Sequence, residues 1–283
     1  MPKYIDIHAH TNFVVFDEDR DVVVRRALEN DTWLINVGTQ YDTSKKAVEM
    51  TKEYEGVFAT IGLHPIHTEA SYHDTNELGK EGKEFTSRGE IFDKEKYREL
   101  ANDKKVVAIG ECGLDYYHLN EDSIEKQKTA FISQIELANE LGLPLMLHIR
   151  NNLEDKTHNA YFDVYELLEK YSKVKAVSHF FAGSVEDMKR FVEMGVFISF
   201  AGPITYKPNL KICDYEEVIR QTPMNMILTD TDSPYVAPVP HRGKRNEPIY
   251  VSEIVKKIAE IKNLSEEEVA KQVVLNAKQL FNI

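Results

Sequence analysis

Short runs of β-branched and apolar residues recur along the 283-residue chain, separated by stretches long enough to form helices. There are eight such runs, at residues 4–8, 33–38, 57–62, 106–111, 143–148, 174–179, 196–201 and 226–231. Strands that are apolar on both faces and alternate with helices indicate a parallel sheet covered by helices. Eight of these units predict an α/β fold of the (β/α)8 or TIM barrel type, and an open doubly wound sheet is the alternative.

The segments between the runs differ in length. Residues 67–103 are long and charged, so we expect an elaborated loop after the third strand that contains a helix at 93–103. Residues 123–142 have apolar positions at helical spacing and end at a glycine, which predicts an amphipathic helix. No repeat, low-complexity tract or linker divides the sequence, and we therefore interpret residues 1–283 as a single domain.

Composition limits the function classes. A net charge of −12 argues against nonspecific coating of nucleic acid, which requires clustered Lys and Arg, but it leaves room for an enzyme that contacts a few phosphates. No leader peptide or membrane span is expected, because no apolar stretch reaches the required length. We expect a cytoplasmic protein, or a nuclear one if the source is eukaryotic, with a monomer expected and Cys112 and Cys213 reduced.

Polar residues that can bind metals follow or close several of the apolar runs. His8 and His10 are two apart, so on a strand their imidazoles point to the same side, although an HxH pattern alone is a weak motif. The remaining members of this set are Glu111, His148, His179 and Asp232. The carboxyl ends of barrel strands meet at one mouth, where active sites are built, so we expect these six side chains to be neighbours.

Each of these residues has an ordinary structural explanation when taken alone. A single histidine at a strand end is often only hydrogen-bonded, and Glu111 could cap a following helix. Six ionisable groups at one barrel mouth, however, carry a desolvation and repulsion cost that a cation removes. Mixed nitrogen and oxygen ligands suit Zn²⁺ or Mn²⁺, and six ligands are enough for two divalent ions that share a carboxylate.

Seven ordered sequence blocks carry a resemblance to a known family: DIHAHTNF, IGLHPIH, IGECGLDYY, LHIR, SHFFAG, TDTDSPY and GKRNEP. Together they resemble the TatD family of metal-dependent deoxyribonucleases, within the amidohydrolase superfamily. The likeness extends from Asp6 to about Pro248. It implies a (β/α)8 fold, a centre of divalent metal ions (Zn²⁺, Mg²⁺ or Mn²⁺) and hydrolysis of DNA, commonly as an exonuclease.

The resemblance also implies roles for individual residues. His8 and His10 would bind one metal, Glu111 would be shared between metals, and the second metal would take two further histidines. The residues to which it assigns the remaining roles are His148 and His179 as second-metal ligands, Asp232 as the last ligand, His64 as an additional active-site histidine and Arg150 as a phosphate ligand.

The sequence departs from the family pattern at several places. Asp230 stands where the family usually has Glu, and it could instead be a partner of the ligands. His67 falls one residue later than the usual HPH spacing, Asn151 replaces an acidic residue that often follows the arginine, and Phe180 replaces a cysteine. The ligand positions themselves are unaffected by these departures.

The mechanism that we expect from this site is attack of a metal-activated water on phosphorus, with Asp232 as the acceptor of the proton of the water. The basic loop 241–245 could guide DNA through Arg242, Lys244 and Arg245, and plain solvation is an equal interpretation. The aromatic residues beside the ligands could stack on bases or pack at the rim of the barrel. These residues are Tyr116, Tyr117, Phe180 and Tyr235.

Two further functions remain as alternatives. The same set of ligands serves hydrolysis of ester or C–N bonds, for example in a deacylase that acts on aminoacyl-tRNA, and such an enzyme would differ mainly in its loops. A noncatalytic, metal-stabilised binding module is the second alternative, and it predicts that Asp232→Asn leaves function intact.

Overall fold

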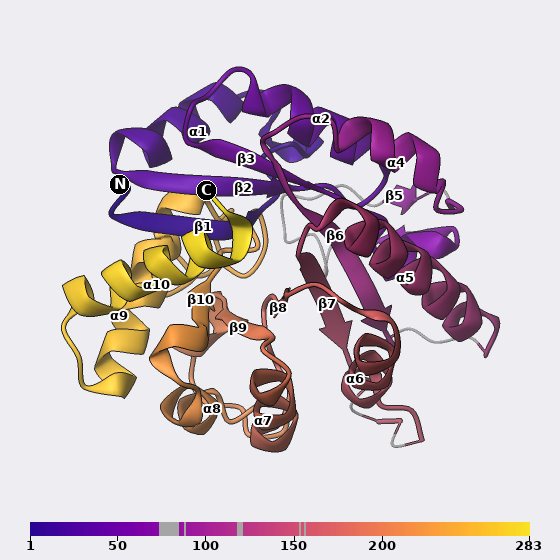
Figure 1. Cartoon of the computed structure of the whole chain (residues 1–283). Helices are drawn as coiled ribbons and strands as arrows, with labels where there is room; N and C mark the ends of the chain where they lie inside the picture. The colour runs from indigo at the N-terminus through magenta and orange to yellow at the C-terminus, as the bar shows by residue number, and fades with distance from the viewer. Residues whose placement is uncertain (74–84, 88, 118–120, 153, 156) are drawn as a thin grey trace.

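The computed structural model describes residues 1–73, 85–87, 89–117, 121–152, 154–155 and 157–283. Eight parallel strands follow one another around a nearly closed barrel in the order β1-β2-β3-β6-β7-β8-β9-β10 (Figure 1). Their bounds are β1 Tyr4–Ala9, β2 Thr32–Val37, β3 Val57–Ile61, β6 Val106–Asp115, β7 Leu145–Arg150, β8 Ala176–Ser178, β9 Phe197–Phe200 and β10 Ile227–Thr229. The predicted TIM barrel is confirmed, and the open sheet is excluded.

Backbone contacts between the first strand and the segment after the last strand close the barrel. The N–H of His10 donates to the carbonyl of Ser233 at 2.7 Å, and the N–H of Asp232 donates to the carbonyl of His8 at 2.9 Å. A parallel bridge joins Ala9 to Ser233. This closure places Asp232 next to His8 in β1 and His10 directly after it.

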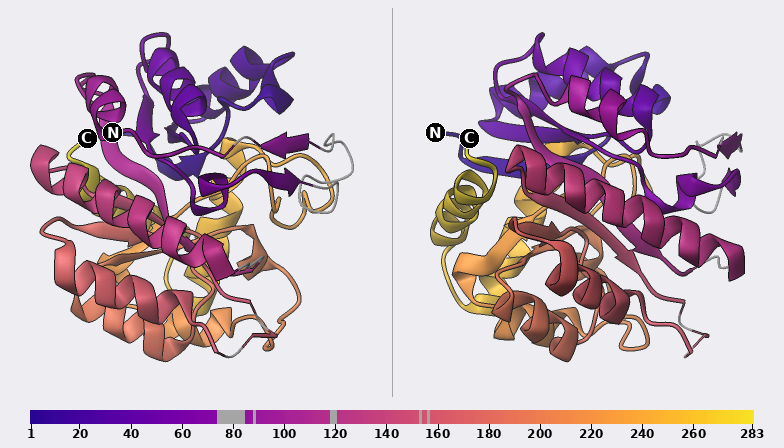
Figure 2. Two further views of the ribbon diagram at one scale, coloured as in Figure 1. Left: turned by 90° about the vertical axis from the view of Figure 1, so that its right-hand side faces the viewer. Right: turned by 45° about the vertical axis from the view of Figure 1, so that its right-hand side comes forward.

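Helices surround the barrel and cover the outer face of its strands (Figure 1). Their bounds are α1 Arg20–Glu29, α2 Tyr41–Thr51, α4 Lys94–Leu100, α5 Glu121–Leu141, α6 Ala160–Tyr171, α7 Val185–Glu193, α8 Tyr215–Gln221, α9 Val251–Lys262 and α10 Glu266–Phe281. Short 3-10 helices are η1 Val14–Phe16, η2 Pro65–Thr68, η3 Gly202–Thr205, η4 Met224–Met226 and η5 Pro248–Tyr250. The two termini lie side by side at one end of the barrel (Figure 2).

The core lies between the strands and these helices. In α5, Phe131, Ile135 and Ala138 are fully buried at the spacing that predicted this helix. Burial of a side chain the size of Phe131 or Ile135 contributes about 1.5–3 kcal/mol. Cys112 and Cys213 are buried free thiols, in agreement with the expected reduced state. Among the described residues, no helix combines the length and the apolarity needed to cross a membrane.

The segment after β3 carries the additional structure that its length predicts. It continues into η2 and an antiparallel pair of strands, β4 Ser71–His73 and β5 Phe85–Ser87, which projects from the barrel (Figure 2). The predicted helix at 93–103 is α4, which is shorter. Residues 74–84 and 88 of this predicted loop lie outside the described residues.

Candidate metal centre

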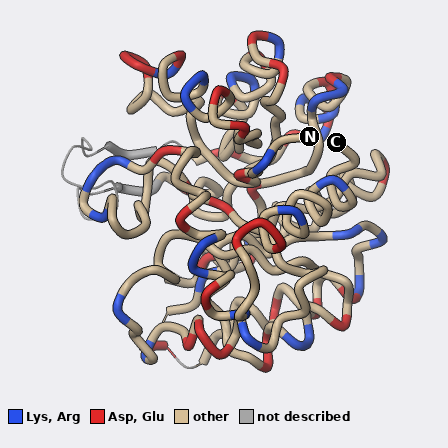
Figure 3. Tube along the Cα trace, turned by 90° about the vertical axis from the view of Figure 1, so that its left-hand side faces the viewer, with Lys and Arg blue, Asp and Glu red and all other residues tan. Residues whose placement is uncertain are grey.

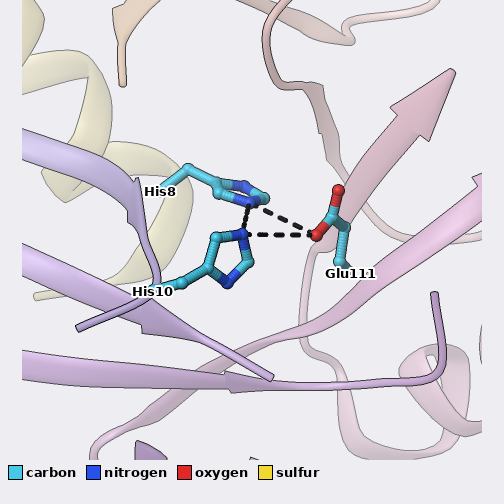
Figure 4. A group of neighbouring side chains, drawn as sticks. All are labelled: His8, His10 and Glu111. Carbon is cyan, nitrogen blue, oxygen red and sulfur yellow. Dashed lines mark hydrogen bonds and ion pairs between the residues drawn. The ribbon is translucent and has the colours of Figure 1, made fainter. Parts of the chain in front are cut away.

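His8, in β1, and His10, which directly follows the end of β1, form one side of the site. His8 and His10 are buried, and their Nε2 atoms are 3.1 Å apart (Figure 4). The Nδ1 atom of His10 lies 3.0 Å from the carbonyl of Val37, which can only accept, so Nδ1 carries the proton in the neutral ring. The lone pair of His10 is therefore on Nε2, the nitrogen that faces His8.

Glu111 approaches these histidines with one oxygen of its carboxylate. Its Oε2 atom lies 3.4 Å from Nε2 of His8 and 3.8 Å from Nε2 of His10 (Figure 4). The ligand atoms of these three residues are close enough together to hold one cation. Such a site would use two imidazole nitrogens and one carboxylate oxygen, a set that zinc and similar ions accept.

The other oxygen of Glu111 faces a second group of histidines. Its Oε1 atom lies 2.8 Å from Nε2 of His179, 3.0 Å from Nδ1 of His148 and 3.4 Å from Nε2 of His64. The side chain of Glu111 thus stands between two sets of imidazoles, one at each oxygen. This is the arrangement expected of a carboxylate that bridges two cations.

Asp232 completes the first group from the segment after β10. Its Oδ1 atom lies 3.4 Å from Nε2 of His10 and 3.8 Å from Nε2 of His8. The backbone of Asp232 has a positive φ of 52°, a conformation that occurs at functional sites more often than elsewhere. Its side chain is 14% exposed, against 4% for Glu111, so Asp232 is the carboxylate more accessible from solvent.

Two of the predicted positions within the strands are wrong. Glu111 and His148 were expected at strand ends, but β6 continues to Asp115 and β7 continues to Arg150. The apolar run ends at Glu111, but the strand continues through Cys112 and through Gly113, which has a φ of +134°. A Cβ on Gly113 would lie 2.1 Å from the carbonyl oxygen of His148, so only glycine permits this close approach of the strands.

Asp115 is a site residue that the sequence reasoning missed. Its buried carboxylate contacts Nε2 of His148 through Oδ2 at 2.7 Å and accepts the N–H of Tyr117 through Oδ1 at 2.9 Å. Burial alone would lower the pKa of His148, but hydrogen bonds with Asp115 and Glu111 outweigh it and raise the pKa to about 9. Asp115 therefore fixes the ring of His148 with Nδ1 directed at Glu111. The sequence feature that could have revealed Asp115 is its i+4 spacing from Glu111, because on an extended strand these two side chains lie on the same face.

Asp6 was also missed, although it shares the HxH stretch. It is fully buried and accepts hydrogen bonds from the N–H and hydroxyl of Thr231, at 2.9 and 2.5 Å, and from the N–H of His8 at 3.2 Å. Burial raises the pKa of Asp6 well above its ordinary value. The carboxyl of Asp6 thus joins β1 to the segment that carries Asp232.

Three groups of the site, His8, Glu111 and Asp232, are in the protonation states that a cation requires, whereas the pKa of His10 and of His148 is raised, so a cation would displace a proton from these two rings. Burial, followed by the proximity of His179, lowers the pKa of His8 to about 3, so this ring is neutral at neutral pH. Burial would raise the pKa of Glu111, but the nearby histidines His64, His8 and His179 lower it well below its ordinary value. For Asp232 too, burial is outweighed, here by contact with His10, and its pKa is lowered. Neutral imidazoles and ionised carboxylates fit divalent metal ions.

His64 lies beside the second group in a different orientation. Its Nδ1 accepts the N–H of Ile66 at 3.2 Å, so the neutral ring carries its proton on Nε2. That nitrogen faces Oε1 of Glu111, and burial, with His148 nearby, lowers the pKa of His64. This geometry favours a hydrogen-bond donor at His64. His67 is buried, with its ring 5.8 Å from that of His64.

The remaining departures from the family pattern have local partners. Asp230 accepts the N–H of Phe180 at 3.1 Å and the hydroxyl of Ser199, and burial raises its pKa to about 6. It therefore contacts the segment next to His179. Asn151 accepts the N–H of Ala160 at 2.6 Å and so contacts the first residue of α6.

A broad cleft of about 2330 Å³ opens over the site at the carboxyl ends of the strands. Arg150 lines it, exposed, with its guanidinium 3.7 Å from the ring centre of Tyr117. Tyr116 is fully buried and donates to Asp163, so of its two interpretations the structure favours packing over stacking on a base. Phe180 and Tyr235 are half-buried at the cleft.

The predicted basic loop 241–245 borders the same cleft. Arg245 pairs with Asp19 at 2.9 Å, which holds its charge in an ion pair, whereas Arg242 and Lys244 are exposed. Among the described residues, acidic and basic positions are mixed along the trace, without one large basic segment (Figure 3). The cleft therefore depends on a few individual cations for any contact with an anion.

The chain is similar to known metal-dependent hydrolases. The sequence model of the family described as TatD related DNase matches residues 5–282. The metal-dependent hydrolase YabD of Bacillus subtilis strain 168 is 37% identical over 281 residues, which are 98% of each chain. The metal-dependent hydrolase YcfH of Escherichia coli K12 is 30% identical over 285 residues, 99% of this chain and 96% of YcfH.

Solved structures show the same relationship. The TatD homologue YJJV of Escherichia coli K12 superposes with a TM-score of 0.79 at 25% identity, covering 99% of this chain and 98% of that one. A TatD family hydrolase from Entamoeba histolytica gives 0.77 at 26% identity with the same coverage. The chain belongs to the TatD family of metal-dependent hydrolases.

Proposed function

We propose that this protein is a metal-dependent deoxyribonuclease that hydrolyses phosphodiester bonds of DNA with activated water, from strand ends as an exonuclease. The observation that carries the proposal is the position of Glu111, with one carboxylate oxygen facing His8 and His10 and the other facing His148 and His179. This arrangement suits two divalent cations. Membership of a family described by its DNase activity supports DNA as the substrate.

The residues that would hold the cations are those of the two groups around Glu111. His8, His10 and Asp232 would hold one cation, and His148 and His179 the other. Two bound cations would supply an acidified water and positive charge beside the phosphoryl oxygens. We assign Asp232 as the acceptor of the proton of the water, because its carboxylate is ionised at neutral pH and more exposed than Glu111.

Arg150 and His64 would contact the substrate or its immediate surroundings. The guanidinium of Arg150 lies flat on Tyr117, which leaves its N–H edge to donate two parallel hydrogen bonds to a phosphate. The proton on Nε2 of His64 points to Oε1 of Glu111 and would keep that oxygen oriented between its neighbours.

The test is cleavage of end-labelled single- and double-stranded DNA by metal-stripped protein to which Mg²⁺, Mn²⁺ or Zn²⁺ is returned. We expect a ladder that grows from one end, and its loss in Asp232→Asn. Asp163→Asn is the matched control, because Asp163 contacts Tyr116 and Lys128 and no proposed metal ligand. It should cleave like the parent protein.

Two results would contradict the proposal. Binding of two ions without cleavage of DNA, together with hydrolysis of esters or amides, would favour the deacylase or amidohydrolase alternative that the same ligands allow. Unchanged function in Asp232→Asn would favour the noncatalytic binding module.

A further inference from the structure

The cations that line the cleft fall into two classes. Three of them form ion pairs with carboxylates: Arg245 with Asp19, Lys257 with Glu260 and Arg220 with Glu216. Within the part of the chain that the structure describes, three others line the cleft with no carboxylate at salt-bridge distance. These are Arg150, Lys207 and Arg242. The protein has a net charge of −12, so cations in one cleft that have no carboxylate partner can attract an anion to that cleft.

Arg242 and Lys207 belong to two segments that line the cleft, the loop after β10 and the residues directly after η3. The guanidinium of Arg242 lies 4.2 Å from the ring centre of Tyr206, and Lys207 is the next residue in the chain. Tyr206 donates its hydroxyl proton to the carbonyl of Ala237 at 2.8 Å, which fixes the ring under Arg242. A guanidinium stacked flat on a ring leaves its N–H edge free to bind a phosphate.

The two segments that carry these residues are held together. The N–H of Val239 donates to the hydroxyl of Thr205 at 2.9 Å. A Cβ on Gly202 would lie 1.9 Å from the carbonyl oxygen of Val236, so the start of η3 and the loop after β10 are in close backbone contact. Arg242 and Tyr206 therefore belong to one packed unit.

This unit is continuous with the metal centre. The loop that carries Arg242 begins at Asp232, and Asn246 closes it by donating its amide to the carbonyls of Thr231 and Tyr235, each at 2.7 Å. The N–H of Asn246 also donates to the carbonyl of Pro234 at 3.0 Å. The position of Arg242 is thus set by the same loop that positions Asp232.

We propose that Arg242 and Lys207, supported by the ring of Tyr206, form a second phosphate subsite of the cleft. The inference rests on the proposed nuclease function and names its substrate class: a polynucleotide with a phosphate at this subsite in addition to the phosphodiester at the metal centre. A small diester with a single phosphate cannot use both positions. The subsite therefore favours oligonucleotides over small phosphodiesters.

Two measurements test the subsite in Arg242→Gln. The first is the ratio of kcat/KM for a long oligonucleotide to kcat/KM for bis(p-nitrophenyl) phosphate with the metal-loaded enzyme. The second is binding of a fluorescent phosphorothioate oligonucleotide, by anisotropy, at several salt concentrations. We expect the ratio and the affinity each to fall about tenfold, as for loss of one charge-assisted contact. The slope of log Kd against log salt should fall by about 0.7–0.9.

Lys244→Gln is the matched control, because Lys244 is an exposed cation of the same loop but does not line the cleft. Lys244→Gln also removes one positive charge, so its effect measures the nonspecific electrostatic attraction of the oligonucleotide. Equal effects of the two substitutions, no effect of Arg242→Gln, or failure of the parent protein to bind the oligonucleotide would overturn the inference. Binding that weakens only in Arg242→Gln, without cleavage of DNA by the parent, would support the subsite and refute the nuclease function.

Discussion

Substitution of Asp115 by Asn tests whether this residue orients a metal ligand. Asn keeps the size of the side chain and an oxygen for the N–H of Tyr117, but it removes the negative charge 2.7 Å from Nε2 of His148. Loss of a hydrogen-bonded partner of a ligand usually costs about 10–100-fold in metal affinity. That range corresponds to about 1.4–2.7 kcal/mol of binding free energy.

The effect should be confined to one of two cations. His148 belongs to the histidine group at Oε1 of Glu111, whereas His8 and His10 face Oε2. In Asp115→Asn we therefore expect one Kd to rise about 10–100-fold and the other to remain near the parent value. Titration calorimetry of the metal-free protein, with metal content measured after dialysis, resolves the two dissociation constants.

The control is Asp163→Asn, which removes a carboxylate from α6 and should change neither Kd. Equal weakening of both cations in Asp115→Asn would mean that the substitution disturbs the barrel as a whole. Two unchanged dissociation constants would refute the orienting role, and His148 would then be held by its strand alone.

Three other outcomes follow from the geometry. Gly113→Ala should lower the free energy of unfolding by about 2–4 kcal/mol, because its Cβ would meet the carbonyl of His148; unchanged chemical denaturation would refute this. Because the pKa of His148 is about 9, above its unfolded value, the metal-free protein should lose stability between about pH 6.5 and 9, and His148→Asn should flatten that slope. Chelation should lower Tm by about 5–10 °C from a state with metal at 100 times Kd, and an unchanged Tm would contradict a built site.

Much of the barrel was predictable because its strands are buried on both faces. Runs such as residues 57–62 and 106–111 consist of apolar residues without a strict alternation, and the structure has a strand at each. The polar ends of these runs also predicted which side chains meet. His8, His10 and Asp232 converge because barrel closure brings the first and last strands together, a consequence of topology rather than of local sequence.

The details of β6 could not be predicted in the same way. Glycine weakens a strand on average, so Gly113 gives no sign in the sequence that the strand continues. In the folded chain that glycine allows β6 and β7 to approach, which continues the strand and brings Asp115 to His148. Propensity describes one segment at a time, whereas this contact depends on a neighbour more than 30 residues away. The choice between stacking and packing for Tyr116 could not be made for the same reason, since its hydroxyl bonds to Asp163 of α6.

The hydrogen bonds between His8, His10 and the segment at Asp232 and Ser233 have a consequence for the order of events during synthesis. They join residues more than 220 positions apart, and contacts of such separation form late in folding. A ribosome releases the last of these residues only after most of the barrel exists. The nascent chain then lacks Asp232, one of the proposed ligands, until its final quarter emerges. The full set of proposed ligands is therefore assembled only when the first strand and the segment after the last strand have joined.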